Sequence, residues 1–175
     1  MSHRLNELTE LITQWGADRS IVQNATPFAQ SRKTHEEVCE LVEAVARELM
    51  AETMKSEGHL YEKEVKDAIG DIYVTLVMVC ACNGTPIRMD LDFAQVGGMD
   101  KGPLDFVCKL VPDLIRDCVD EATTTRVTAR RMVCGLVSLC AEMGLDFTEC
   151  VEQAYQTIKD RKGTLRPDGV FVKEA

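Results

Sequence analysis

Four polar side chains recur at helical spacing within residues 27–45. They are Gln30, Lys33, Glu37 and Glu40. The steps of three, four and three residues would place all four within roughly 80° of one another around a helix axis, with Glu36 at the edge of this face. A Glu-x-x-Glu pair is usually a solvated helix surface, because glutamate favours helices and is mostly exposed. The pair becomes a candidate metal site only if further carboxylates join it.

A second acidic face follows in residues 61–82. On a helix, Glu64, Asp67 and Asp71 share one side, and an apolar run from Ile72 to Cys82 comes directly after them. The run is too short to span a bilayer, which takes about 20 residues, so it predicts a buried helix and no membrane segment. Carboxylates one turn from a buried segment are costly unless a cation neutralises them. Mg²⁺ does so with a few carboxylates and keeps positions for water and substrate phosphates.

The combination resembles the MazG-like all-α nucleoside triphosphate pyrophosphohydrolases. The similar pieces are Gln30, Lys33 and Glu36-Glu37-Val38-Cys39-Glu40-Leu41, then Ala68-Ile69-Gly70-Asp71, and then residues 154–163 and 168–174. The similarity covers residues from about 10 to 84 and from 144 to 174. It implies a MazG-like helical bundle that hydrolyses a (d)NTP to the monophosphate and pyrophosphate. It also implies Mg²⁺ as the cofactor, with Mn²⁺ able to substitute.

The resemblance and the two acidic faces together give each side chain an expected role. The expected metal ligands are Glu37, Glu40, Asp67 and Asp71, and the expected catalytic residues are Lys33, Glu36 and Glu37. The expected substrate-binding residues are Trp15, Gln30, Lys33, Lys159, Arg161 and Lys162. As a carboxylate that holds no metal, Glu36 would take a proton from the attacking water, and Lys33 would reach a phosphate.

One position departs from the family pattern. Where the family has a glutamate three residues before the aspartate that follows glycine, this chain has Ala68. An acid lies one residue earlier, at Asp67, while the literal Glu-x-x-Asp runs from Glu64 to Asp67. We expect Asp67 and Asp71 to be the paired ligands, with Glu64 in reserve. The departure keeps a second function open, a helical oligomeric binding or scaffold protein whose catalytic centre has decayed.

Two of the expected substrate contacts have structural alternatives. Trp15, near the end of the first predicted helix, either packs at a helix end or presents a ring face to a nucleobase. Lys159, Arg161 and Lys162, which close the last predicted helix, either complement the helix dipole or bind phosphates. The sequence leaves both pairs of alternatives open.

Composition favours one soluble domain over residues 1–175. The chain is 45% hydrophobic and 28% charged, with a net charge of −9, which argues against a surface that coats nucleic acid. The eight cysteines include no Cys-x-x-Cys pair, and residues 1–20 lack the pattern of a secretory signal. We therefore expect a cytoplasmic protein with reduced thiols, most of them small core residues.

Hydrophobic periodicity predicts an all-α fold. The predicted helices cover residues 2–15, 27–55, 60–82, 103–119, 124–143 and 146–162, followed by an extended tail docked on the body. Pro112 would kink or divide the fourth helix, and a loop with a possible short strand near 89–93 precedes it. Residues 85–144 read as a helical insertion between the acidic helix and the last helix. Helices that turn acidic faces inward usually need a partner to close the pocket, so we expect a homo-oligomer, a dimer or a tetramer.

Overall fold

The computed structural model describes residues 2–54, 61–87, 101–120, 122–167, 169 and 171–174. In this part of the chain the fold is all-α, as predicted, apart from one short pair of strands. The elements are α1 (Ser2–Asp18), α2 (Ile21–Asn24), α3 (Pro27–Thr53), α4 (Glu62–Cys82), α5 (Pro103–Asp120), α6 (Ala122–Met143), α7 (Phe147–Ile158), β1 (Gly163–Leu165) and β2 (Phe171–Lys173). The two strands pair antiparallel, with Thr164 opposite Val172.

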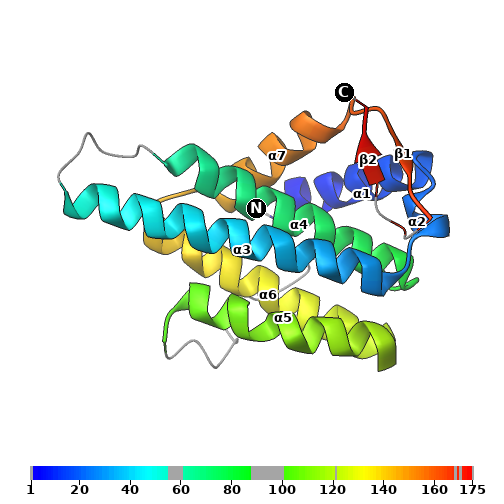
Figure 1. The fold of residues 1–175 in the computed structure, drawn as a ribbon, viewed down its shortest axis with the longest axis horizontal. Coiled ribbons are helices and arrows are strands. Elements are labelled where there is room, and N and C mark those ends of the chain that lie inside the picture. Colours follow the sequence, from blue (N-terminus) through cyan, green and yellow to red (C-terminus); the bar gives the residue numbers. More distant parts are fainter. Residues whose placement is uncertain are drawn as a thin grey trace.

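Helices α3 and α4 form the central pair of the molecule (Figure 1). The hairpin of α5 and α6 packs on one side of this pair, while α1, α7 and the strands lie on the other side. The helices of the predicted insertion therefore form one hairpin beside α3 and α4. The two acidic faces lie on the central pair itself, and α7 packs against α4 on the side opposite the hairpin.

Helix α4 is the most enclosed helix because its sequence is apolar on every side after Asp71. The run from Ile72 to Cys80 is buried throughout, as the periodicity predicted. The helix contacts α1, α2, α3, α6 and α7. Gly70 permits a close approach to α7, because a Cβ at this position would lie 2.5 Å from the carbonyl oxygen of Cys150. Close packing of α4 on α7 carries the neighbouring aspartate into the interior.

Three predicted boundaries differ from the structure. Helix α1 continues to Asp18, so Gly16 lies inside the helix, where the absence of a side chain makes room for Met78. Pro112 does not divide α5, which runs unbroken from Pro103 to Asp120 with the proline ring exposed. Helix α7 ends at Ile158 and not near 162. The possible strand near 89–93 lies outside the described residues.

Trp15 of α1 and Arg19, the residue directly after α1, contact the chain where α7 ends. The indole nitrogen of Trp15 donates to the carbonyl oxygen of Ile158 at 2.7 Å. The guanidinium of Arg19 donates to the carbonyl oxygens of Arg161 at 2.8 Å and Lys159 at 3.0 Å. Only the carbonyl of Ile158 belongs to the last turn of α7, and the backbone N–H of Arg161 also donates to it at 2.8 Å. The basic residues after Ile158 therefore lie outside the helix, in a segment that Trp15 and Arg19 contact.

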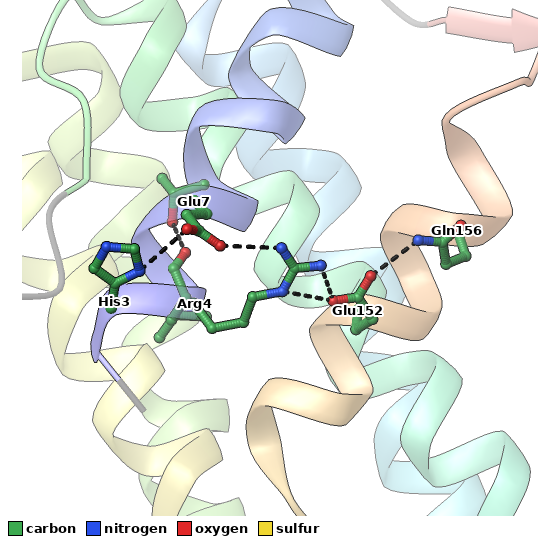
Figure 2. A network of polar contacts seen from close by, with 7 residues as sticks. His3, Arg4, Glu7, Glu152 and Gln156 are labelled. Atoms are coloured by element: carbon green, nitrogen blue, oxygen red, sulfur yellow. Dashed lines mark hydrogen bonds and ion pairs between the residues drawn. The ribbon is translucent and has the colours of Figure 1, made fainter.

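A polar network joins the other end of α1 to α7 (Figure 2). Arg4 donates through Nε to Glu152 at 2.9 Å and through Nη1 to Glu7 at 3.1 Å. Gln156 donates to the same Glu152 at 2.9 Å, so its amide is directed along α7 toward this network (Figure 2). Exposed ion pairs of this kind each contribute only about 0–1 kcal/mol. They link α1 to α7 and add little to the free energy of unfolding.

The cysteines are all free thiols. Cys80, Cys134, Cys140 and Cys150 are buried, and Cys82, Cys108 and Cys118 are half-buried. The prediction of core cysteines is confirmed for the buried ones and wrong for Cys39, which is exposed on α3. Among the described helices, none is both long enough and apolar enough to cross a membrane.

Candidate active site

A cavity of about 110 Å³ lies between α1, α3, α4, the end of α7 and β2. Its polar side chains are Gln30, Lys33, Glu37, Asp71, Thr75 and Arg161, and its apolar side chains are Trp15, Ile21, Val74, Met78, Ile158 and Phe171. Six residues that the sequence singled out for chemistry thus meet around one space: Trp15, Gln30, Lys33, Glu37, Asp71 and Arg161. They come from three helices and the segment after α7.

Two carboxylates on facing helices define the acidic part of the cavity. Burial raises the pKa of Glu37 to about 7, and the charges of Asp71 and Glu40 add to this effect. Burial also raises the pKa of Asp71 to about 6; the charge of Arg161 opposes the rise, and Asp67 and Glu40 reinforce it. The carboxylates of α3 and α4 are therefore close enough to repel one another, as the two acidic faces predicted.

Two cations face these carboxylates. The Nζ of Lys33 lies 2.8 Å from Glu36 Oε2 and 3.6 Å from Glu37 Oε1. Burial lowers the pKa of Lys33, but the hydrogen bond to Glu36 and the charge of Glu37 outweigh it and leave the pKa raised. Arg161 approaches from the segment after α7, and its charge lowers the pKa of Asp71. The charged part of the cavity therefore holds groups of both signs.

The acidic side chains of α4 differ in their surroundings. Asp67 accepts a hydrogen bond from Gln153 of α7, and its charge acts on Asp71. Glu64 lies 3.5 Å from the guanidinium of Arg47 and is half exposed. Ala68 is buried in the core. Asp67 is thus the acid of the second motif whose charge reaches Asp71, whereas Glu64 pairs outside the cavity.

Glu37 and Asp71 supply carboxylate oxygens, the donor type that a hard divalent cation prefers. Glu37 and Asp71 both line the cavity, and their raised pKa values show that neighbouring carboxylates and burial leave their charges poorly compensated. Within the described residues no three carboxylate, imidazole or thiol groups converge on one point. Lys33 and Gln153 engage Glu37 and Asp67 in this arrangement. A cation bound at Glu37 would compete with Lys33, and Asp67 could become a third ligand only by giving up its hydrogen bond from Gln153.

Five of the expected site residues do not line the cavity: Asp67, which pairs with Gln153, and four others. The other four are Glu36, Glu40, Lys159 and Lys162, and all four are exposed. Glu36 and Glu40 lie on α3 and interact with residues of the cavity. Glu36 contacts Lys33, and the charge of Glu40 raises the pKa of Glu37. The charge of Lys159 acts on Glu152, which belongs to the network in Figure 2. The structure therefore groups Arg161 with the carboxylates and leaves the two lysines apart.

Trp15 is a helix-end contact that also forms a wall of the cavity. Its hydrogen bond to Ile158 fixes the indole, which is 8% exposed. The guanidinium carbon of Arg19 lies 4.9 Å from the indole centroid, and the ring of Phe171 meets it edge-on with centroids 5.7 Å apart. These contacts leave the indole little freedom to reorient around a ligand.

Several residues of the site escaped the sequence analysis. Gln153 donates a hydrogen bond to Asp67, and Arg19 donates one to the carbonyl of Arg161. In both cases the partner is distant in the sequence. Met78 and Thr75 read as parts of an apolar helix, and only the expectation that the tail docks on the body pointed toward Phe171. None of these residues belongs to a local pattern that would have revealed its position.

Comparison with known proteins gives a limited result. No family model matches the chain, and no solved structure matches it. The chain is 33% identical over 79 residues to an uncharacterized 18.2 kDa protein from the rep-hol intergenic region of Haemophilus phage HP1 (strain HP1c1). The match covers 45% of this chain and 41% of the phage protein, so it spans less than half of that protein.

Proposed function

We propose that the chain is a Mg²⁺-dependent nucleoside triphosphate pyrophosphohydrolase of the MazG-like kind, which converts a (d)NTP and water to the (d)NMP and pyrophosphate. The observation that carries the proposal is the pairing of Glu37 and Asp71 with Lys33 and Arg161 around one cavity. A triphosphate needs cationic contacts and a metal site together, while its base and sugar need an apolar wall. Lys33 and Arg161 supply the cationic groups, Glu37 and Asp71 are the proposed metal ligands, and the apolar side chains of the cavity are the proposed wall.

The reaction requires a water oxygen to bond to the α-phosphorus as the bond from this phosphorus to the α,β-bridging oxygen breaks. Pyrophosphate leaves with the bridging oxygen, and a carboxylate takes the proton that the water loses. Glu36, held by Lys33 at 2.8 Å, is the proposed proton acceptor. Lys33 contacts a phosphate as a point charge, and Arg161 contacts one with its planar guanidinium.

Glu37 and Asp71 would hold Mg²⁺, with Glu40 and Asp67 adjoining them, and the bound ion would neutralise phosphate charge and favour ionisation of the attacking water. Mn²⁺ would serve in its place. The alternative function is a helical oligomeric binding or scaffold protein with a decayed centre. Ala68, buried in the core where the family carries a carboxylate, favours this alternative.

The test is pyrophosphate release from each dNTP and from dUTP, with Mg²⁺ and with EDTA. We expect Mg²⁺-dependent release that Asp71→Asn and Asp67→Asn reduce to similar extents, because each removes an anionic group near the metal. Glu64→Gln should retain activity, since Glu64 pairs with Arg47. Glu43→Gln, an exposed carboxylate on the same helix α3, is the matched control.

Absence of release from every triphosphate would refute the enzyme and leave the scaffold. If Glu64→Gln is inactive while Asp67→Asn is active, the second motif uses Glu64 in place of Asp67. Light scattering on the purified protein, with and without nucleotide, tests the proposed dimer or tetramer independently of turnover.

A further inference from the structure

The second half of α3 exposes a row of apolar side chains. Val42, Leu49 and Met50 are 38%, 56% and 65% exposed, and Ala46 is exposed between them. Counted from the exposed Cys39, the row advances by three, four and three residues to Leu49, which is the spacing by which one helix packs along another. A contiguous exposed apolar surface of this kind indicates that a partner covers it.

A groove of about 680 Å³ adjoins the first part of this row, between α3 and α5. Val38 and Val42 of α3 and Val111 and Ile115 of α5 belong to its apolar lining. Leu49 lies two turns beyond Val42 and does not line the groove. One side of α3 therefore presents a hollow and, further along the helix, exposed apolar side chains with no hollow beside them.

This arrangement allows two copies of the chain to cover each other. In a two-fold symmetric interface the same surface faces itself, so each part must fit its symmetry-related part. A two-fold axis at Ala46 would place two α3 helices antiparallel. Met50, four residues after Ala46, would then face Val42 of the other copy, four residues before it. The small side chain of Ala46 would let the two helices approach closely at the axis.

The charges beside the row favour the antiparallel direction. Arg47 Nη2 lies 3.6 Å from Glu43 Oε2 and 3.5 Å from Glu64 Oε2 of the same chain. Because Glu43 and Arg47 lie on either side of Ala46, antiparallel copies bring opposite charges together, whereas parallel copies would align each charge with its like. Such pairs at the edge of an interface select its orientation and add little to its affinity.

We infer that the exposed row of α3 and the groove between α3 and α5 form a homodimer interface, in which a second copy of the chain lies antiparallel about Ala46. Lys33 and Glu37 project from the other side of α3, so this dimer leaves the candidate active site open. The inference therefore does not depend on the proposed function. It places the partner subunit away from the acidic faces, which one chain encloses by itself.

The first test is sedimentation velocity of the wild type and Leu49→Glu across a wide range of protein concentrations. We expect a wild-type dimer whose Kd rises at least about 10-fold in the variant, which corresponds to about 1.4 kcal/mol. Leu49 is exposed in the monomer, so the new charge should leave the monomer folded, as circular dichroism can check. Val127→Glu is the matched control, because Val127 is 51% exposed on α6 and does not line the groove.

The second test is cross-linking of Ala46→Cys with diamide. Two thiols at the axis would form a disulfide as the diazene takes up their two protons and two electrons, and the product is a covalent dimer. Val127→Cys, treated in the same way, should stay uncross-linked. In the wild type, the reaction of Cys39 with a thiol reagent should slow as the protein concentration rises, because the second copy covers the groove.

A wild type that stays monomeric at every concentration would overturn the inference, and so would a dimer that Leu49→Glu leaves intact. A dimer that Leu49→Glu weakens, but that Ala46→Cys does not cross-link, would refute the antiparallel arrangement about Ala46. If no triphosphate is hydrolysed while these results hold, the proposed function alone fails and the interface stands.

Discussion

Glu37→Gln should make the metal-free protein more stable at pH 8. The pKa of Glu37 is raised from 4.5 to about 7 in the folded state, first by burial and then by the charges of Asp71 and Glu40. A carboxyl group with a raised folded pKa stabilises the fold fully below its unfolded pKa and loses this contribution as the pH rises through the folded value. At pH 8 the charged side chain therefore opposes folding, and a neutral amide of the same shape relieves the repulsion.

The magnitude follows from the two pKa values. Each pKa unit corresponds to about 1.36 kcal/mol, so the rise from 4.5 to about 7 sets an upper limit of about 3 kcal/mol. Solvent at the open side of the cavity screens the charge, and Lys33 loses one of its two partners in the variant, so we expect a gain of about 1–2 kcal/mol. Lys33 keeps its shorter contact with Glu36.

The assay is urea unfolding of the wild type and Glu37→Gln at pH 5 and pH 8 with EDTA. The variant should exceed the wild type at pH 8 and show no such advantage at pH 5, where the wild-type side chain is protonated in the folded state. Mg²⁺ should then stabilise the wild type and not the variant. Glu43→Gln, at a carboxylate that is 74% exposed, should change stability by less than about 0.5 kcal/mol. A variant that is less stable than the wild type at pH 8 would refute the reasoning.

Three further predictions concern packing, the metal and the thiols. Gly70→Ala should cost about 1–3 kcal/mol in thermal unfolding, because the new Cβ would lie 2.5 Å from the carbonyl oxygen of Cys150; an unchanged melting temperature would contradict the close approach of α4 and α7. Mg²⁺ or Mn²⁺ should raise the melting temperature of the wild type by binding only the folded state, and Glu40→Gln should reduce this shift because it removes a neighbouring charge. In native protein a thiol reagent should modify Cys39 first and the buried thiols only after denaturation, whereas uniform rapid labelling would show that the core opens.

The acidic face on α3 was predictable because, in any helix, residues three and four apart in the sequence lie on the same side. Once residues 27–53 form one helix, the spacing of Gln30, Lys33 and Glu37 places them on one side whatever the rest of the chain does. The position of Asp71 was predictable for a related reason, since it ends a polar segment just before a long apolar run. Both conclusions need only secondary structure and the burial of α4.

The walls of the cavity depend on contacts that span most of the chain. Trp15 and Ile158 are 143 residues apart in sequence, and Arg19 and Arg161 are 142 residues apart. The segment after α7 is held in the same way, because Trp15 donates to the carbonyl of Ile158 and Arg19 donates to those of Lys159 and Arg161. Neither helix propensity nor charge pattern in residues 159–162 contains this information, so the sequence predicted a helix that is one turn too long.

The position of the cavity also indicates what the α5–α6 hairpin does not do. All twelve lining residues lie within residues 15–78 and 158–171, which fall inside the two stretches where the MazG-like resemblance was drawn. The α5–α6 hairpin packs on the opposite side of α3 and α4 and contributes no described side chain to the lining. A homo-oligomer was expected because inward acidic faces usually need a partner to close the pocket. Here α1 and β2 of the same chain form the apolar wall, so any partner subunit would act on the charged end or on the α5–α6 side.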